Sequence, residues 1–207
     1  MSRYRVLNMI PNILTGLRLF AGVIMFLVLA GATGIPGLSS YLSPDDQFAL
    51  YRVGFWIFVV AASTDWVDGF LARRWGAQSK WGAILDPIAD KVLITGAILG
   101  VLTSGSLTMI AIPCGLILFR EFAVSALREA LPDHAELPVT QLAKWKTTVQ
   151  LVALGAYQLI LLWDGFGLPL EWQPPFQDFA YFLIWLAAII TLWTGWQYFK
   201  DARRQLV

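Results

Sequence analysis

The stretch that decides how this chain folds and reacts reads Asp65-Trp66-Val67-Asp68-Gly69-Phe70-Leu71-Ala72-Arg73 and, after eight further residues, Gly82-Ala83-Ile84-Leu85-Asp86-Pro87-Ile88-Ala89-Asp90. Asp65 and Asp68 share one face of a helix, because they are three residues apart. Asp86 and Asp90, four apart, share a face of the next helix. Four carboxylates gather while ionised only when cations lie between them. Since no His or Cys accompanies these oxygens, they favour a hard divalent cation.

The remainder of the chain has the composition of a membrane protein. Of its 207 residues, 57% are hydrophobic and 14% are charged, and the mean hydropathy is +0.63, which excludes an ordinary soluble domain. Six apolar segments approach the ~20 residues needed to cross the hydrocarbon core; they cover 11–32, 48–71, 81–103, 107–127, 145–163 and 176–199. We therefore predict an all-α integral membrane protein with six transmembrane helices, a short interfacial segment at the N-terminus, and a single domain over residues 1–207.

Lysine and arginine are distributed unevenly between the connections. They occur at both ends of the chain and in the second and fourth connections, whereas the stretches 33–47, 104–106 and 164–175 carry none. The positive-inside rule then places both termini and the aspartate motif on the cytoplasmic side. Carboxylates at membrane depth are costly, so a functional site is the favoured reading over simple helix caps that face the headgroups.

Two further groups of polar residues lie inside apolar segments. Asn12, Thr15 and Arg18 fall on about a third of the circumference of the first segment, which indicates a binding face, although Arg18 alone would be expected to snorkel. In the fourth segment, Arg120 with Arg128 indicates a cationic pocket, because guanidinium groups grip phosphate through paired N–H donors. The alternative is that Arg120 merely pairs with a carboxylate. Glu121 is a poor partner by this reasoning, because neighbouring helix residues point apart.

The Gly96-x3-Gly100 pair in the third segment predicts close packing against another helix, since small residues let helices approach in a membrane.

The pattern D-x2-D-G-x2-A-R-x8-G-x3-D-x3-D is complete from Asp65 to Asp90 and resembles the signature of the CDP-alcohol phosphotransferases, integral membrane enzymes that build phospholipid headgroups. Residues 10–18, 120–129 and 144–150 resemble the phosphatidylglycerophosphate synthases, a bacterial branch of that family. The resemblance implies a dimeric six-helix protein of the bacterial inner membrane. It would transfer the phosphatidyl group from CDP-diacylglycerol to sn-glycerol 3-phosphate, which releases CMP.

The resemblance also implies roles for individual residues. Two Mg²⁺ or Mn²⁺ ions would be held by Asp65, Asp68, Asp86 and Asp90, with Asp86 and Asp90 catalytic and Asp90 the base that deprotonates the acceptor. The CDP group would be bound by Asn12, Thr15, Asp65, Asp68, Gly69, Ala72, Arg73 and Gly82. The acceptor phosphate would be bound by Arg120, Lys144, Arg128 and Arg18. The expected partners are the two substrates, membrane lipids and a second copy of the chain, with no nucleic acid.

Two alternatives remain open at this point. Within the family, the alternative acceptors are an inositol phosphate, phosphatidylglycerol and serine, the last disfavoured by a cationic pocket. A divalent-cation transporter would also place carboxylates in helices, but such sites tend to lie at the midplane between repeats. Here the carboxylates cluster at one end of their helices and no inverted repeat is apparent.

Overall fold

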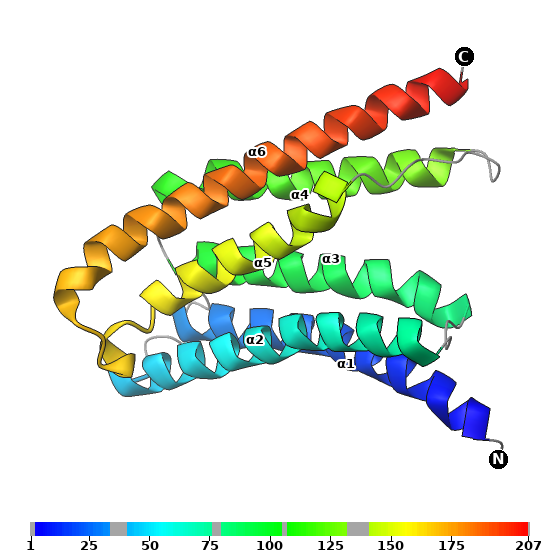
Figure 1. Cartoon of the computed structure of the whole chain (residues 1–207). Coiled ribbons are helices and arrows are strands. Elements are labelled where there is room, and N and C mark those ends of the chain that lie inside the picture. The colour runs from blue at the N-terminus through cyan, green and yellow to red at the C-terminus, as the bar shows by residue number, and fades with distance from the viewer. Residues whose placement is uncertain (1–2, 34–40, 76–79, 105–106, 132–140, 207) are drawn as a thin grey trace. The chain divides into compact units, whose positions relative to one another are not determined.

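The computed structural model describes residues 3–33, 41–75, 80–104, 107–131 and 141–206; several side chains within these ranges, including those of residues 65–75 and 144, lie outside the description. Over the described residues the chain is helical nearly throughout and contains no β-strand. The long helices are α1 (Arg3–Thr33), α2 (Pro44–Trp75), α3 (Lys80–Thr103), α4 (Leu107–Ala130), α5 (Gln141–Ile160) and α6 (Gln173–Leu206), with the short turns η2 (Asp164–Phe166) and η3 (Leu170–Trp172) before α6 (Figure 1). They form two compact units, Met1–Gly105 with Leu161–Gly167, and Ser106–Ile160 with Leu168–Val207.

In the first unit, α1 is the central helix. It packs along both α2 and α3, whereas α2 and α3 barely touch each other. Fully buried side chains line the shared core, among them Met25 and Leu29 of α1, Phe58 of α2, and Leu93 and Ile98 of α3. Burial of a large aliphatic or aromatic side chain contributes about 1.5–3 kcal/mol, so this three-helix core fixes how α3 lies against α1.

Glycines bring α1 and α3 unusually close together. A Cβ added at Gly96 would lie 2.5 Å from the carbonyl oxygen of Gly22, and one added at Gly100 would lie 2.6 Å from the Leu29 side chain. The prediction that Gly96 and Gly100 mark close helix packing is therefore confirmed. The contact sets the distance between the backbones of α1 and α3 through the first unit.

In the second unit, α6 is the central helix and packs along α4 and α5. Small buried residues of α6, namely Ala180, Ala187 and Ala188, allow the close approach. Larger buried side chains such as Ile117 of α4 and Leu154 of α5 fill the remaining core. In each unit, two long helices thus pack against one central helix.

Within the described residues, four helical stretches are long and apolar enough to cross a membrane: Asn12–Ala32, Pro44–Thr64, Met109–Ala130 and Leu170–Arg204. The chain is therefore an all-helical membrane protein. The prediction of six crossings also counts α3 and α5, which do not reach the same apolarity over their described residues, because each carries charged residues in its first half. The predicted interfacial segment before residue 11 is continuous with α1, which begins at Arg3.

Candidate functional site

The carboxylates of α3 lie against the polar face of α1. The Thr15 hydroxyl donates a hydrogen bond of 2.5 Å to Oδ1 of Asp86, and the Arg18 guanidinium donates one of 2.9 Å to Oδ1 of Asp90. Arg18 is almost fully buried, with 1% of its surface exposed, whereas Asp86 is exposed. The polar face predicted for α1 is therefore a lining of the carboxylate site.

The pairing follows from a constant register between α1 and α3. Thr15 meets Asp86 with an offset of 71 residues and Arg18 meets Asp90 with an offset of 72. About one helical turn after Arg18, Gly22 lies against the backbone of Leu93, again at an offset of 71 residues. Because the helices run parallel at this spacing, the glycine contact in the core and the hydrogen bonds at the site belong to a single interface.

The other half of the aspartate motif lies in the last turns of α2. Asp65, Asp68, Gly69, Ala72 and Arg73 fall within this helix, so Asp65 and Asp68 share a face as predicted. Their side chains lie outside the description. In α3, Gly82 is buried, and on α1 Asn12 is half-buried. Both have further polar interactions within the chain.

The donor set at this site suits a hard cation. Asp86 and Asp90 present carboxylate oxygens one turn apart on α3, and within the described chain only one oxygen of Asp86 accepts a hydrogen bond. Among the described side chains, no group of three or more His, Cys, Asp or Glu residues gathers; Asp65 and Asp68 are not among those side chains. The described side chains therefore include two of the four predicted metal ligands, Asp86 and Asp90. Carboxylate oxygens are ligands that Mg²⁺ prefers.

The second unit contains a buried cluster of opposite charge. Oε1 of Glu121 accepts a short hydrogen bond from Lys146 and longer ones from Gln150 at 3.3 Å and from Arg120 at 3.4 Å. The side chains of Arg120, Glu121 and Lys146 are between 10% and 12% exposed. Two cations thus share one carboxylate away from water, and the cluster retains a net positive charge.

Arg120 corrects one expectation drawn from the sequence. We expected it to point away from Glu121, yet the two side chains are in contact. The long Arg120 side chain bends back toward Glu121, while its second terminal nitrogen donates a hydrogen bond of 3.2 Å to Thr194 of α6. Its Nε is buried, and none of the described residues forms a hydrogen bond with it. The guanidinium is therefore held by two helices without all of its donors being used.

Gly195 of α6 makes room for this arrangement. A Cβ at Gly195 would lie 2.7 Å from Cγ and 2.9 Å from Nε of Arg120. Arg120 and Gly195 also line a groove of about 510 Å³ between α4 and α6. Of the described residues that line it, Arg120 is the charged one.

The other predicted phosphate ligands are distributed more widely. Arg128 is exposed, donates a hydrogen bond of 3.1 Å to the hydroxyl of Tyr198 and lies over that ring. Lys144 lies in the first turn of α5, and its side chain is outside the description. Arg18 belongs to the carboxylate site of the first unit, where Asp90 binds it.

Sequence reasoning missed the residues that surround Arg120. Gln150 donates a hydrogen bond of 2.7 Å to Thr191 and so joins α5 to α6. Its amide nitrogen also contacts Glu121. Thr194 and Gly195 belong to the same turn of α6. The available signal was weak: two threonines and a glycine within five residues of an otherwise apolar helix.

The chain belongs to the CDP-alcohol phosphatidyltransferase family, whose family model matches residues 8–193. The match includes the complete aspartate motif, Arg120, Glu121 and Lys146, and it ends just before Thr194 and Gly195.

Three relatives have the name CDP-diacylglycerol–glycerol-3-phosphate 3-phosphatidyltransferase. The protein of Cereibacter sphaeroides is 38% identical, with 93% of this chain and 95% of the relative covered. The protein of Haemophilus influenzae is 37% identical over 73% of this chain and 77% of the relative. The protein of Escherichia coli strain K12 is 40% identical over 73% of this chain and 79% of the relative.

Proposed function

We propose that this chain transfers the phosphatidyl group from CDP-diacylglycerol to sn-glycerol 3-phosphate, which yields phosphatidylglycerophosphate and CMP. The family and the names of the three relatives support this reaction. The single observation that carries the choice of acceptor is the buried cationic cluster around Arg120. A net positive charge away from water is costly, and a phosphate on the acceptor would compensate it.

The first unit would bind the donor substrate. Asp65, Asp68, Asp86 and Asp90 would hold two Mg²⁺ or Mn²⁺ ions, and these would neutralise the pyrophosphate and stabilise the leaving CMP. The remaining CDP contacts would come from Asn12, Thr15, Gly69, Ala72, Arg73 and Gly82. The hydrogen bond from Thr15 to Asp86 and the ion pair between Arg18 and Asp90 would keep both carboxylates in fixed orientations.

The second unit would bind the acceptor through its phosphate. Arg120 would supply the donors that Glu121 and Thr194 leave unused, and Lys144 and Arg128 remain proposed as further contacts of this unit. Arg18, which lies in the first unit and pairs with Asp90, remains a separately proposed phosphate contact. Glu121 would orient Arg120 and Lys146 by accepting from both, without cancelling both charges. A neutral acceptor would leave the remaining positive charge uncompensated, so we expect it to react poorly.

The chemical step requires the acceptor's primary hydroxyl to lose a proton. We propose that Asp90 accepts it while the hydroxyl oxygen bonds to the phosphorus that carries the diacylglycerol. The bond from that phosphorus to the CMP oxygen breaks. Positioning and charge neutralisation account for most of the catalysis in such transfers, which agrees with carboxylates and cations held by helix packing.

A panel of acceptors tests the proposed function. Purified protein with CDP-diacylglycerol and Mg²⁺ should release CMP rapidly with sn-glycerol 3-phosphate, and at background rates with glycerol, serine, inositol phosphate or phosphatidylglycerol. CMP release that is independent of any acceptor, or equally fast with glycerol, would contradict the acceptor assignment. Transport of Mn²⁺ into sealed vesicles without CMP release would favour a transporter.

We further propose that all six helices cross the bacterial inner membrane as one domain, with both termini and the active site on the cytoplasmic side. Two exposed positions test this orientation in a Cys114→Ser background, Lys200→Cys near the end of α6 and Asp164→Cys in η2. A membrane-impermeant thiol reagent should label the second in intact cells, and the first only after the inner face is opened. The reverse pattern would invert the topology.

We also propose that the protein is a homodimer, as the resemblance implies. Light scattering of the purified protein, with the detergent contribution subtracted, should give twice the chain mass of 23.1 kDa. A mass of one chain at all concentrations would contradict the dimer.

A further inference from the structure

A long apolar groove runs along the first unit between α1 and α2. Its volume is about 640 Å³. Its walls are large side chains that remain substantially exposed, from Leu17, Phe20 and Ile24 of α1 and from Val53, Trp56 and Val60 of α2. The small residues Ala21 and Ala61 also line it, and they leave space that bulkier residues would fill.

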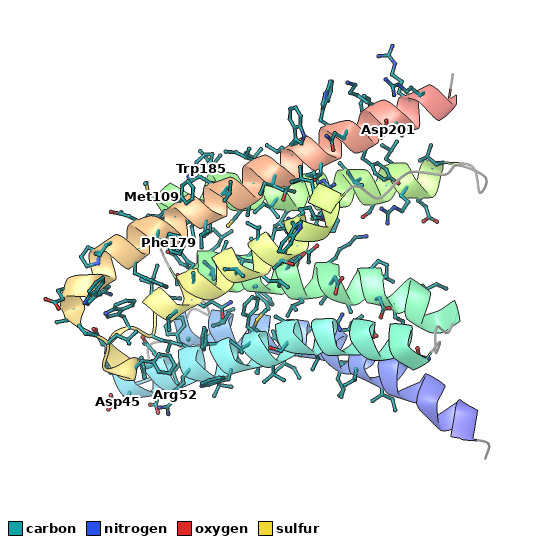
Figure 2. All side chains as sticks on the ribbon, viewed as in Figure 1. Asp45, Arg52, Met109, Phe179, Trp185 and Asp201 are labelled. Carbon is teal, nitrogen blue, oxygen red and sulfur yellow. The ribbon has the colours of Figure 1, made fainter. Side chains whose placement is uncertain are left out.

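An arginine lies at each end of this groove. Arg18, at the end toward the aspartate motif, is buried and bound to Asp90. Arg52, at the other end, is exposed, and no residue of the described chain forms a hydrogen bond or an ion pair with it. Figure 2 shows Arg52 near the beginning of α2, where Asp45 also lies. The arginine at the end toward the aspartate motif is therefore paired, whereas the one at the other end has no ion-pair partner among the described residues.

The position of Arg52 along α2 defines its place in the bilayer. It lies thirteen residues before Asp65, roughly 20 Å along the helix at 1.5 Å per residue. It also lies within the membrane-crossing stretch Pro44–Thr64, eight residues after Pro44. An arginine inside the hydrocarbon region is costly unless it reaches a polar group, and its long side chain lets it extend toward the nearer headgroups. That surface is the one opposite the aspartate motif.

We propose that the α1–α2 groove is a binding site for one anionic phospholipid of the leaflet opposite the active site. Its phosphate pairs with the Arg52 guanidinium, and an acyl chain lies along the groove toward Ala21 and Ala61. From Arg52 to Thr64 the groove extends about 18 Å, more than half of the ~30 Å hydrocarbon core. A net negative headgroup is favoured over a zwitterionic one because no carboxylate among the described residues pairs with Arg52. The phosphate contact is proposed at Arg52, the end away from the aspartate motif, and the inference does not rest on the proposed reaction.

Native mass spectrometry of the purified protein tests this site. With dioleoylphosphatidylglycerol added, wild-type protein should retain one lipid that dioleoylphosphatidylcholine does not displace. Arg52→Gln should weaken that binding about ten-fold, the effect of losing one charge-assisted contact. Arg203→Gln, which removes an exposed arginine of α6, is the matched control and should leave binding unchanged. Ala21→Phe, which fills the groove with Arg52 intact, should also reduce binding.

Several outcomes would overturn the proposal. If Arg52→Gln bound phosphatidylglycerol as well as wild type, Arg52 would not pair with the lipid phosphate. If Arg203→Gln lost as much lipid binding as Arg52→Gln, the lipid would be held by general attraction to surface charge. If Arg52→Gln raised the KM for CDP-diacylglycerol without changing retention of phosphatidylglycerol, the groove would belong to the substrate. If either groove variant changed the oligomeric state without changing lipid retention, the α1–α2 groove would be a contact with a second copy of the chain.

Discussion

Each unit places charged side chains in apolar helices, but the two groups differ in net sign and in exposure to solvent. In the first unit, the described carboxylates Asp86 and Asp90 face one cation, Arg18, and Asp86 is exposed. In the second, two cations, Arg120 and Lys146, share the single carboxylate of Glu121 and are nearly buried. The carboxylate site of the first unit therefore retains negative charge, and the Arg120 cluster of the second unit retains positive charge.

The difference shows how each unit limits what it binds. An exposed carboxylate can exchange water for a metal ion and for the pyrophosphate that the ion carries. A buried cation is more selective, because only a negatively charged ligand offsets the free-energy cost of its desolvation. Changing charge in the first unit should therefore stop the reaction, whereas changing it in the second should alter the choice and affinity of the acceptor.

The largest effect is expected at the carboxylates. Asp86→Asn should lower turnover roughly a thousand-fold, since metal-ion stabilisation is worth several kcal/mol and each ~1.4 kcal/mol is ten-fold. The rate of CMP release at saturating Mg²⁺ measures this, and circular dichroism checks that the variant is folded. Asp201→Asn, at an exposed carboxylate of α6 paired with Arg204, should be unaffected. Near-normal turnover in Asp86→Asn would refute the metal site.

Arg120→Ala should raise the KM for sn-glycerol 3-phosphate about ten- to a hundred-fold, the value of a charge-assisted contact of ~1.5–3 kcal/mol. The KM for CDP-diacylglycerol should change little, because that substrate is assigned to the first unit. Initial rates with each substrate varied at saturation of the other separate the two constants, with Arg203→Ala as control. Equal increases in both KM values would contradict the division of labour between the units.

Gly195→Ala should raise the same KM about five-fold, because the new methyl group would overlap the Arg120 stem and force it to shift. The matched control is Gly115→Ala in α4, where an added Cβ meets nothing within 4 Å. It should leave the KM unchanged and keep the thermal midpoint at least as high, since alanine favours helix over glycine. If Gly195→Ala matched Gly115→Ala in both readouts, Gly195 would have no part in positioning Arg120.

The smallest effect is expected at Thr15. Thr15→Val removes its hydrogen bond to Asp86 and should raise the Mg²⁺ concentration for half-maximal activity roughly three-fold, since water can replace the hydroxyl at an exposed carboxylate. Thr15→Ser retains the donor and should behave like wild type. A larger effect on the KM for sn-glycerol 3-phosphate than on the Mg²⁺ requirement would place Thr15 with the acceptor instead.

The sequence by itself determined the class of fold, the shared face of the α3 carboxylates and the presence of a close helix contact. The apolar segments required helices, because lipid cannot satisfy exposed backbone amides. The spacing of Asp86 and Asp90 on α3 placed both on one face, as helical periodicity demands. The glycines of α3 likewise predicted a close approach before its partner was known. All of these are local properties that recur at fixed intervals along one helix.

The tertiary structure decided which helices supply the partners. The register that pairs Thr15 with Asp86 and Arg18 with Asp90 depends on how α1 seats against α3, and residues about 71 apart carry no periodic signal that links them. The contact between Arg120 and Glu121 depends on side-chain bending that helix geometry alone argued against. The roles of Thr194 and Gly195 follow from the packing of α6 on α4, which brings residues more than seventy positions apart into contact.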